Sequence, residues 1–183
     1  ADIAAILPAL PDAIMLPKAD GASSIAQLDM IWRSEGGEED HFPPILPIAT
    51  ETPQAIFSLG SYREISDRLL GLTWGAEDLP AAIGASASRE EDGNYTAPYQ
   101  LARSLTLFAA HAAGTAAIDT VFPAISNLDG LKRYAQLARR DGFTGMMAIH
   151  PSQVEPINAA FTPSAEELAR AHAILEAFNA NPH

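Results

Sequence analysis

Glu77 and Asp78 stand side by side in the stretch GLTWGAEDLPAAIG, residues 71–84, directly after an apolar run. A further acid, Glu51, follows the apolar run ILPIA, residues 45–49, about one strand–helix unit earlier. This separation predicts that Glu51 and Asp78 follow neighbouring strands and face one mouth of a parallel sheet. Paired carboxylates, completed by water and substrate oxygens, are typical of Mg²⁺ sites. We therefore interpret Glu51 and Asp78 as candidate metal ligands.

Each of these acids also has a purely structural interpretation. Glu51 could be a first-turn acid that the dipole of a following helix stabilises. Asp78 could cap the short helix that follows it. The side chain of Glu77 could point away from the site and leave only its backbone near a ligand. The pairing of Glu51 with Asp78, each after an apolar run, favours the metal site over these alternatives.

Other polar residues lie in or directly after apolar runs of the same kind. Lys18, after AIMLP at 13–17, could pair with a substrate anion or neutralise the acids. His150 could bind substrate or act as a base, or it could bond to backbone at the tight turn that Pro151 shapes. Asp119 needs a partner if it is buried. It is either part of a structural network or a site residue.

The chain alternates short apolar runs with longer helical patterns. The runs lack strict polar alternation, which favours strands buried on both faces, as in parallel sheets. The expected strands are residues 13–17, 45–49, 69–74, 116–122 and 146–150. The expected helices are residues 23–36, 52–60, 97–114, 126–142 and 162–178. The polar segment 85–96 is expected to be irregular and could be a mobile lid over a site.

This alternation predicts an α/β fold with a parallel sheet. Five strands could form an open doubly wound sheet or part of an eight-stranded barrel. The first run is not followed by G-x-G-x-x-G, so a dinucleotide-binding fold gains no support. At the start of the last expected helix, Ser164 and Glu167 have the spacing of a capping box.

Length and composition fit one globular domain and narrow the classes of partner. The chain has 183 residues and no cysteine, which excludes disulfides and thiolate chemistry and fits a cytoplasmic enzyme. A net charge of −12 without a basic cluster argues against nucleic acid. No apolar stretch is long enough to cross a membrane, and the start has no signal-peptide pattern. The first residue is Ala1, so we expect a processed or excised piece of a longer chain.

Four stretches of the chain resemble one known family. They are AIMLPKAD, ILPIATETPQAI, LLGLTWGAEDLPAAIG and AAGTAAIDTVFPAISNLDGLKRYAQLARRDGFTGMMAIHPSQVEPINAAFTPSAEELARA. Together they are similar to the citrate lyase beta-subunit-like family, acyl-CoA lyases of the phosphoenolpyruvate/pyruvate barrel superfamily. The similarity runs from about residue 1 to about residue 178. The strings GAEDL and IHPSQ, in this order and spacing, make it specific to the family.

The resemblance implies a TIM-type (β/α)₈ barrel, of which this chain covers about the last five strands and their helices. Residues 1–183 would then form a single partial barrel domain. The N-terminal strands of the family, with an arginine that holds the substrate carboxylate, would lie outside it. So would a C-terminal extension that brings a catalytic aspartate into a neighbouring subunit's site. The resemblance also implies a homo-oligomer, with a trimer suspected.

The resemblance assigns roles to residues of this chain. Glu51 and Asp78 match the Mg²⁺ ligands of the family. Substrate-binding positions are matched by Lys18, by the loop residues Gly75, Ala76 and Glu77, and by His150 and Pro151 at a turn on the CoA side. The chain departs from the family where Lys18, Ala19 and Asp20 replace Lys-Val-Glu, at Pro53 and Gln54, and at Met146.

The activity implied by the resemblance is Mg²⁺-dependent carbon–carbon bond cleavage or formation. A 3-hydroxyacyl-CoA thioester, such as a malyl-, citramalyl- or citryl-thioester, would give an acyl-CoA and an α-keto acid. The proton-transfer groups are unknown within this segment. Alternatives are a CoA-independent metal-dependent aldolase for hydroxy-keto acids, an acyl-CoA thioesterase, or a non-catalytic barrel subunit.

Overall fold

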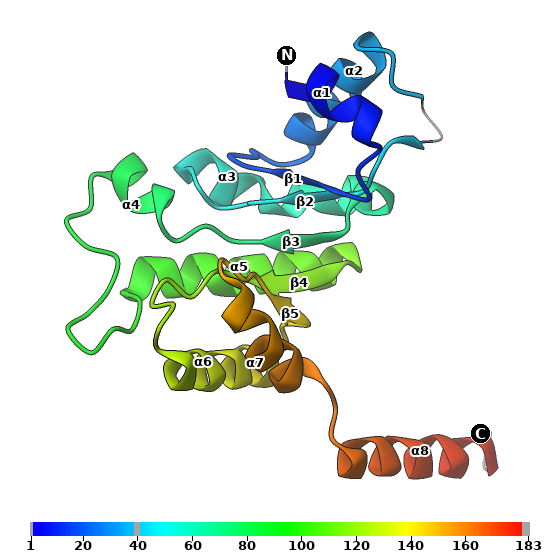
Figure 1. Ribbon diagram of the computed structural model, residues 1–183, viewed down its shortest axis with the longest axis vertical. Helices are drawn as coiled ribbons and strands as arrows, with labels where there is room; N and C mark the ends of the chain where they lie inside the picture. The colour runs from blue at the N-terminus through cyan, green and yellow to red at the C-terminus, as the bar shows by residue number, and fades with distance from the viewer. Residues whose placement is uncertain (1, 39–40, 181–183) are drawn as a thin grey trace.

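The computed structural model describes residues 2–38 and 41–180 (Figure 1). Its strands are β1 (Ile14–Leu16), β2 (Ile45–Pro47), β3 (Gly71–Thr73), β4 (Ala116–Asp119) and β5 (Gly145–Met146). Its α-helices are α1 (Asp2–Ile6), α2 (Ala22–Ser34), α3 (Pro53–Ser58), α4 (Asp78–Ile83), α5 (Ala97–Ala113), α6 (Leu128–Asp141), α7 (Pro151–Phe161) and α8 (Ala165–Ala180). Its 3₁₀ segments are η1 (Leu7–Ala9) and η3 (Leu59–Arg68).

The strands lie side by side in chain order and all run parallel. β1 pairs with β2, and β4 pairs with both β3 and β5. Parallel bridges from Ile45 to Leu69 and from Ile48 to Thr73 join β2 to the β3 segment. The Ala49 N–H donates to the Thr73 carbonyl at 2.8 Å across the same junction. Figure 1 shows the resulting succession from β1 to β5, which confirms the predicted α/β fold with a parallel sheet.

The sheet does not close into a barrel within the described residues. β1 and β5 each pair along one side only there, so they form the two edges. Every predicted strand is present in shortened form. The run at 146–150 departs most, because β5 ends at Met146 and residues 147–150 lead into α7.

The helices agree with their predicted ranges to different degrees. α5 and α6 match 97–114 and 126–142 closely, and each ends at a glycine in the left-handed conformation. α3 covers only part of 52–60, because the chain tightens into η3. No range was predicted for α7, which contains Pro156.

The core sits between the sheet and its helices. Its largest fully buried side chains include the aromatic residues Trp32, Tyr62, Trp74 and Tyr99. A smaller cluster joins α6, β5 and α7 through Leu131, Ala135, Met146 and Ile157. Burying each large apolar side chain stabilises the fold by about 1.5–3 kcal/mol. The packed sheet therefore supports the loops that follow the carboxyl ends of its strands.

The segment 85–96 contains no helix or strand, which confirms the prediction of an irregular segment, and a single isolated bridge shapes it into a hairpin-like turn. Arg89 and Tyr95 form an antiparallel bridge. The Glu90 N–H donates to the Asn94 carbonyl at 2.8 Å across the turn. Tyr95 is buried and packs edge-on against Trp74, with ring centroids 5.0 Å apart. We call residues 88–96 the hairpin.

α8 extends away from the rest of the structure (Figure 1). Its described residues are all exposed. An ion pair between Arg139 of α6 and Glu167, 2.9 Å long, joins it to the domain. The predicted capping box is confirmed, since the Ser164 N–H donates to Glu167 and the Glu167 N–H donates to Ser164 Oγ. In the described ranges, none of the helices has the length and apolar character that crossing a membrane requires.

Candidate functional site

Glu51 and Asp78 meet at the carboxyl ends of β2 and β3. Glu51 follows β2 and is 6% exposed, whereas Asp78 begins α4 and its side chain is about half exposed. Both acids contact Lys18, Glu51 through its backbone N–H and Asp78 through its ammonium group. The sequence prediction that these acids face one mouth of the sheet is therefore confirmed. We call them the acid pair.

The electrostatics of the acid pair disfavour two bare negative charges. Burial raises the pKa of Glu51 above its usual value, and the adjacent Asp78 raises it further. The backbone N–H and the ammonium group of Lys18 act in the opposite direction without cancelling the rise. A divalent cation would relieve this repulsion, because an opposite charge favours the ionised form of both carboxyl groups.

Gly75 makes room for the buried glutamate. A Cβ at this position would lie 2.6 Å from Cγ of Glu51 and 3.0 Å from Ile48. The Gly75 N–H donates to Oγ1 of buried Thr50 at 3.1 Å, which fixes the end of β3 against the end of β2. Ala76 is also buried. Gly75 and Ala76 therefore shape the floor beside the acid pair through their small size.

Lys18, at the end of β1, contacts both members of the acid pair. Its backbone N–H donates to Oε2 of Glu51 at 2.5 Å. Its ammonium nitrogen lies 3.9 Å from Oδ1 of Asp78. Of the two sequence interpretations of Lys18, the structure shows the contact that neutralises the acids. The loop behind it is held by Tyr62, whose hydroxyl accepts from the Gly21 N–H at 3.3 Å.

Glu77 is exposed, and its charge acts on Tyr95 of the hairpin. It stands at the N-cap position of α4, and its side chain makes no capping bond. Burial raises the pKa of Tyr95 to about 12, and the charge of Glu77 contributes to that rise. The role of Glu77 near a ligand stays a prediction.

The chemistry of the donors fits Mg²⁺ better than a softer metal. Carboxylate oxygens are the protein ligands that Mg²⁺ prefers, and it commonly takes only one or two of them and completes its shell with water and substrate. In the part of the chain that the structure describes, no group of three or more His, Cys, Asp or Glu residues could hold a metal. An all-protein cage for a transition metal is therefore not formed by these residues.

His150 and Pro151 lie at the end of β5, apart from the acid pair. His150 is the N-cap of α7, where its Nδ1 accepts from the Ser152 N–H at 3.2 Å and lies 2.8 Å from Ser152 Oγ. Pro151 is the first residue of the helix. The structure therefore gives His150 the backbone-bonded arrangement that the sequence left open.

Asp119 belongs to a buried structural network. Its Oδ1 accepts from Trp74 Nε1 at 2.6 Å, and its Oδ2 accepts from Arg103 at 2.8 and 2.9 Å. The Tyr134 hydroxyl donates to it at 3.4 Å. With these donors the carboxylate is satisfied, so the structural interpretation of Asp119 agrees with the geometry. These donors come from the residue after β3, from α5 and from α6, and no sequence pattern links them to Asp119.

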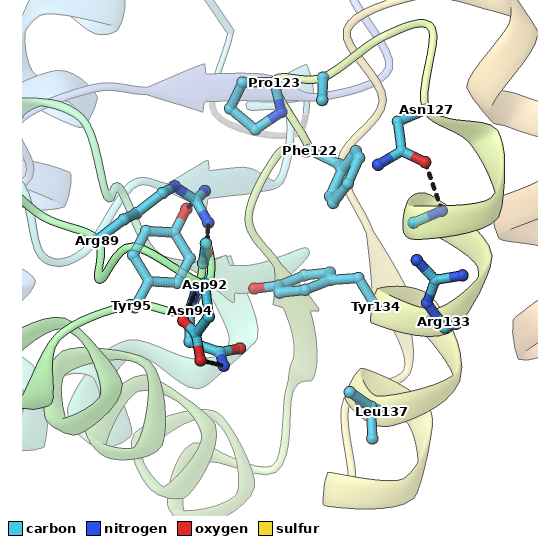
Figure 2. A pocket seen from close by; sticks show the side chains of 13 residues that line it. Arg89, Asp92, Asn94, Tyr95, Phe122, Pro123, Asn127, Arg133, Tyr134 and Leu137 are labelled. Atoms are coloured by element: carbon cyan, nitrogen blue, oxygen red, sulfur yellow. Dashed lines mark hydrogen bonds between the residues drawn. The ribbon is translucent and has the colours of Figure 1, made fainter.

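Sequence reasoning missed a cavity of about 490 Å³ between the hairpin and α6. Figure 2 shows Arg89 and Tyr95 on the hairpin side and Phe122 and Tyr134 opposite them. Arg133, on the same helix as Tyr134, also lines it. The loop that carries Phe122 follows β4 directly, so the cavity opens at the same end of the sheet as the acid pair. We call it the arginine cavity.

Comparison with known proteins places the chain among relatives. The sequence profile of the HpcH/HpaI aldolase/citrate lyase family matches residues 1–151. The chain belongs to this family. A citrate lyase subunit beta-like protein of Mycobacterium tuberculosis is 35% identical over 164 residues, which are 90% of this chain and 55% of that protein. The mitochondrial citramalyl-CoA lyase of Rattus norvegicus is 31% identical over 178 residues, 92% of this chain and 51% of that protein.

Two solved protein structures resemble the chain as well. The crystal structure of CitE from Mycobacterium tuberculosis, in complex with magnesium, acetoacetate and coenzyme A, has a TM-score of 0.72 and 32% identity. That similarity covers 93% of this chain and 58% of the CitE chain. RipC from Yersinia pestis has a TM-score of 0.75 and 32% identity, covering 91% and 72% of the two chains.

Membership of the HpcH/HpaI family confirms the resemblance to citrate lyase beta-subunit-like proteins that the sequence motifs indicated. The chain spans about half the length of the curated relatives it matches. The contacts described above therefore concern the part of the fold that this chain supplies.

Proposed function

We propose that this chain supplies the metal-binding part of a Mg²⁺-dependent carbon–carbon lyase. The substrate would be a 3-hydroxyacyl-CoA thioester, such as a malyl-, citramalyl- or citryl-thioester, and the products an acyl-CoA and an α-keto acid. The observation that carries this proposal is the acid pair, held at adjacent strand ends and incompletely neutralised by Lys18. Support comes from the family, whose member CitE was crystallised with magnesium, acetoacetate and coenzyme A.

The proposed fold of the complete protein is a TIM-type barrel. The parallel strands in chain order would be its last five, and residues 1–183 a single partial barrel domain. The open edges at β1 and β5 support this proposal, because a barrel would pair both of them with further strands.

Glu51 and Asp78 would hold Mg²⁺ through their carboxylate oxygens. When bound, Mg²⁺ would supply Lewis-acid stabilisation of the negative charge that develops on the keto-acid oxygens. Gly75, Ala76 and Glu77 would meet the acid group of the substrate through their backbone. Lys18 would partly neutralise the acid pair before the substrate binds, and it would then face the carboxylate of the substrate.

Bond cleavage requires a base for the hydroxyl proton and an acid for the enolate. Among the described residues the acid pair is suited to hold a cation, and its carboxylates would be occupied by that task. The proton-transfer groups are therefore expected outside this segment. His150 and Pro151 would lie on the side where the CoA moiety enters.

Calorimetric titration with Mg²⁺ tests the metal site. We expect the wild-type chain to bind and Asp78→Asn to lose measurable binding. Glu77→Gln is the matched control, because it removes the neighbouring charge without touching the acid pair, and it should bind Mg²⁺ nearly as the wild type does. Equal binding by all three proteins, or binding by none, would contradict the proposal.

A thioesterase is the second candidate. A relative named (3S)-malyl-CoA thioesterase, from Cereibacter sphaeroides, is 29% identical over 180 residues, 97% of this chain and 57% of that protein. Such an activity would use the same metal site but release free CoA. An assay of malyl-CoA that follows both glyoxylate and free thiol would separate thioester hydrolysis from carbon–carbon cleavage.

The proposed enzyme would also assemble with copies of itself, and a trimer is the first expectation from the family resemblance. Light scattering coupled to size-exclusion chromatography would measure the mass of the assembly directly.

A further inference from the structure

We propose that Asp20 and Thr52 are positioning residues of the metal site, because their hydrogen bond holds the Lys18 amide against the Glu51 carboxylate. The Thr52 hydroxyl donates to Oδ1 of Asp20 at 2.6 Å, within the range of hydroxyl–carboxylate bonds. Neither residue belongs to the acid pair, so each would affect a bound cation only through Glu51. The role in metal binding rests on the proposed function.

Two hydrogen bonds join the turn after β1 to the segment after β2, and they run in opposite directions. The backbone N–H of Lys18 donates to Oε2 of Glu51, whereas the side chain of Thr52 donates to that of Asp20. We call these two the paired bonds. Lys18 and Asp20 are two positions apart, and Glu51 and Thr52 are adjacent, so the same short stretches of backbone carry both bonds. A shift of either stretch would therefore stretch both bonds together.

The Lys18 amide needs a second contact to keep its direction. Lys18 has φ at 52°, a left-handed conformation that lysine rarely adopts. Such a backbone persists only where the surrounding structure holds it in place. The bond between Asp20 and Thr52 closes the turn two residues farther along the chain. It therefore opposes relaxation of Lys18, which would turn its N–H away from Glu51.

Asp20 and Thr52 are themselves held by further bonds. Oγ1 of Thr52 accepts from the Ala55 N–H at 3.0 Å, as the N-cap of α3, which leaves its hydroxyl hydrogen for Asp20. The Asp20 N–H donates to Ser24 Oγ at 2.9 Å, near the start of α2. The side chains of Asp20 and Thr52 thus connect two helix starts at the end of the sheet where Glu51 lies.

The consequence for the metal site is preorganisation of Glu51. A carboxylate that is already oriented loses little conformational freedom when it binds a cation. Residues that hold a metal ligand in position commonly change metal affinity by about 10- to 100-fold when they are replaced. Removing the bond between Asp20 and Thr52 should therefore weaken Mg²⁺ binding although both members of the acid pair remain.

Hydrogen exchange of the Lys18 amide, followed by NMR without Mg²⁺, tests the paired bonds directly. We expect Asp20→Ala to speed this exchange roughly five- to tenfold, the usual effect of one lost hydrogen bond on local opening. The Thr52 cap of α3 remains in that variant. Asp20→Asn keeps an oxygen acceptor for Thr52 and should exchange as the wild type does.

Ser23→Ala is the matched control for the exchange experiment. The exposed Ser23 hydroxyl donates to the Asp20 carbonyl at 3.3 Å and takes no part in the paired bonds. Its loss should leave exchange of the Lys18 amide unchanged. Unchanged exchange in Asp20→Ala, or equal acceleration in Asp20→Ala and Ser23→Ala, would overturn the proposal.

Calorimetric titration of the same variants with Mg²⁺ tests the role in metal binding. We expect about tenfold weaker binding by Asp20→Ala, and affinities near that of the wild type for Asp20→Asn and Ser23→Ala. Equal weakening in Asp20→Ala and Asp20→Asn would assign the effect to charge and would overturn the positioning role. Absence of Mg²⁺ binding by the wild-type chain would contradict the proposed function, whereas the exchange data would still decide whether the paired bonds hold Lys18.

Discussion

The backbone N–H of Lys18 donates to Oε2 of Glu51 from a left-handed conformation, with φ at 52°. An L-residue other than glycine, asparagine or aspartate rarely adopts this conformation, which costs about 1–2 kcal/mol. This strained conformation lies directly after β1, where the backbone N–H of Lys18 must point toward the buried carboxylate of Glu51. Lys18 thus contacts the acid pair through both its backbone and its side chain.

Replacing Lys18 by glycine separates these two contributions. Glycine adopts φ of 52° freely and keeps the N–H that Glu51 accepts, so we expect stability to stay equal or to rise by up to about 1 kcal/mol. The lost ammonium group no longer competes with a cation, so Mg²⁺ should bind more tightly. Thermal unfolding and calorimetry measure the two effects. Lys18→Arg keeps the charge, and tighter Mg²⁺ binding in that variant would contradict the explanation.

Gly75→Ala should damage the metal site through packing alone. Its methyl group would lie 2.6 Å from Glu51 Cγ, so the Glu51 side chain must shift from its present position. We expect a loss of stability of about 1–3 kcal/mol, as for other overpacked sites, together with weaker Mg²⁺ binding. Gly60→Ala is the control, because a Cβ at Gly60 meets nothing within 4 Å. Chemical denaturation measures the stability of both variants, and titration measures their Mg²⁺ binding. Equal results for the two variants would contradict the prediction.

Asp119→Asn should be among the most destabilising single substitutions in the described part of the chain. Asp119 is fully buried, and its loss of charge leaves Arg103 without its main buried partner. Breaking a buried pair in this way costs about 3–5 kcal/mol. Asp129→Asn, at an exposed pair with Lys132, should change the free energy of unfolding by less than about 1 kcal/mol. Similar urea midpoints for the two variants would refute the structural role of Asp119.

The contact between α6 and α8 should respond to acid. Hydrogen bonds from the Ser164 N–H and from Arg139 lower the pKa of Glu167 from 4.5 to about 2. A lowered folded pKa means that the contribution to stability is complete above pH 4.5 and is lost as the pH falls through about 2. Carbon-detected NMR titration of the Glu167 carboxyl group measures this directly.

Arg139→Gln should raise that pKa toward the ordinary value. Arg140→Gln is the matched control, since Arg140 pairs with Asp141 and not with Glu167. If both substitutions moved the Glu167 titration equally, a general charge effect would replace the specific pair as its cause.

The main features of the fold could be predicted because they depend on local patterns. Continuous apolar runs marked every strand, and closing glycines such as Gly114 and Gly142 marked the ends of long helices. Strand lengths were overestimated because pairing depends on a neighbouring chain segment. α7 was given no range because Pro151 and Pro156 weaken the helical pattern, although the His150 cap compensates at its start.

The acid pair was predictable for a similar reason. The carboxyl ends of adjacent parallel strands meet at one edge, so Glu51 and Asp78 had to approach each other once the strands were placed. The arginine cavity gave no such signal. Arg89 and Arg133 lie in a hairpin and a helix that are far apart in sequence, and only tertiary packing brings them to one cavity.

Among residues 2–38 and 41–180, β1 and β5 each have one side that pairs with no other strand. Strand edges with free N–H and C=O groups are templates for further strands, whether of the same protein or of a foreign one. The sheet that orients the acid pair therefore also has two edge strands that are available for pairing. A further strand that pairs along either edge would cover these backbone groups.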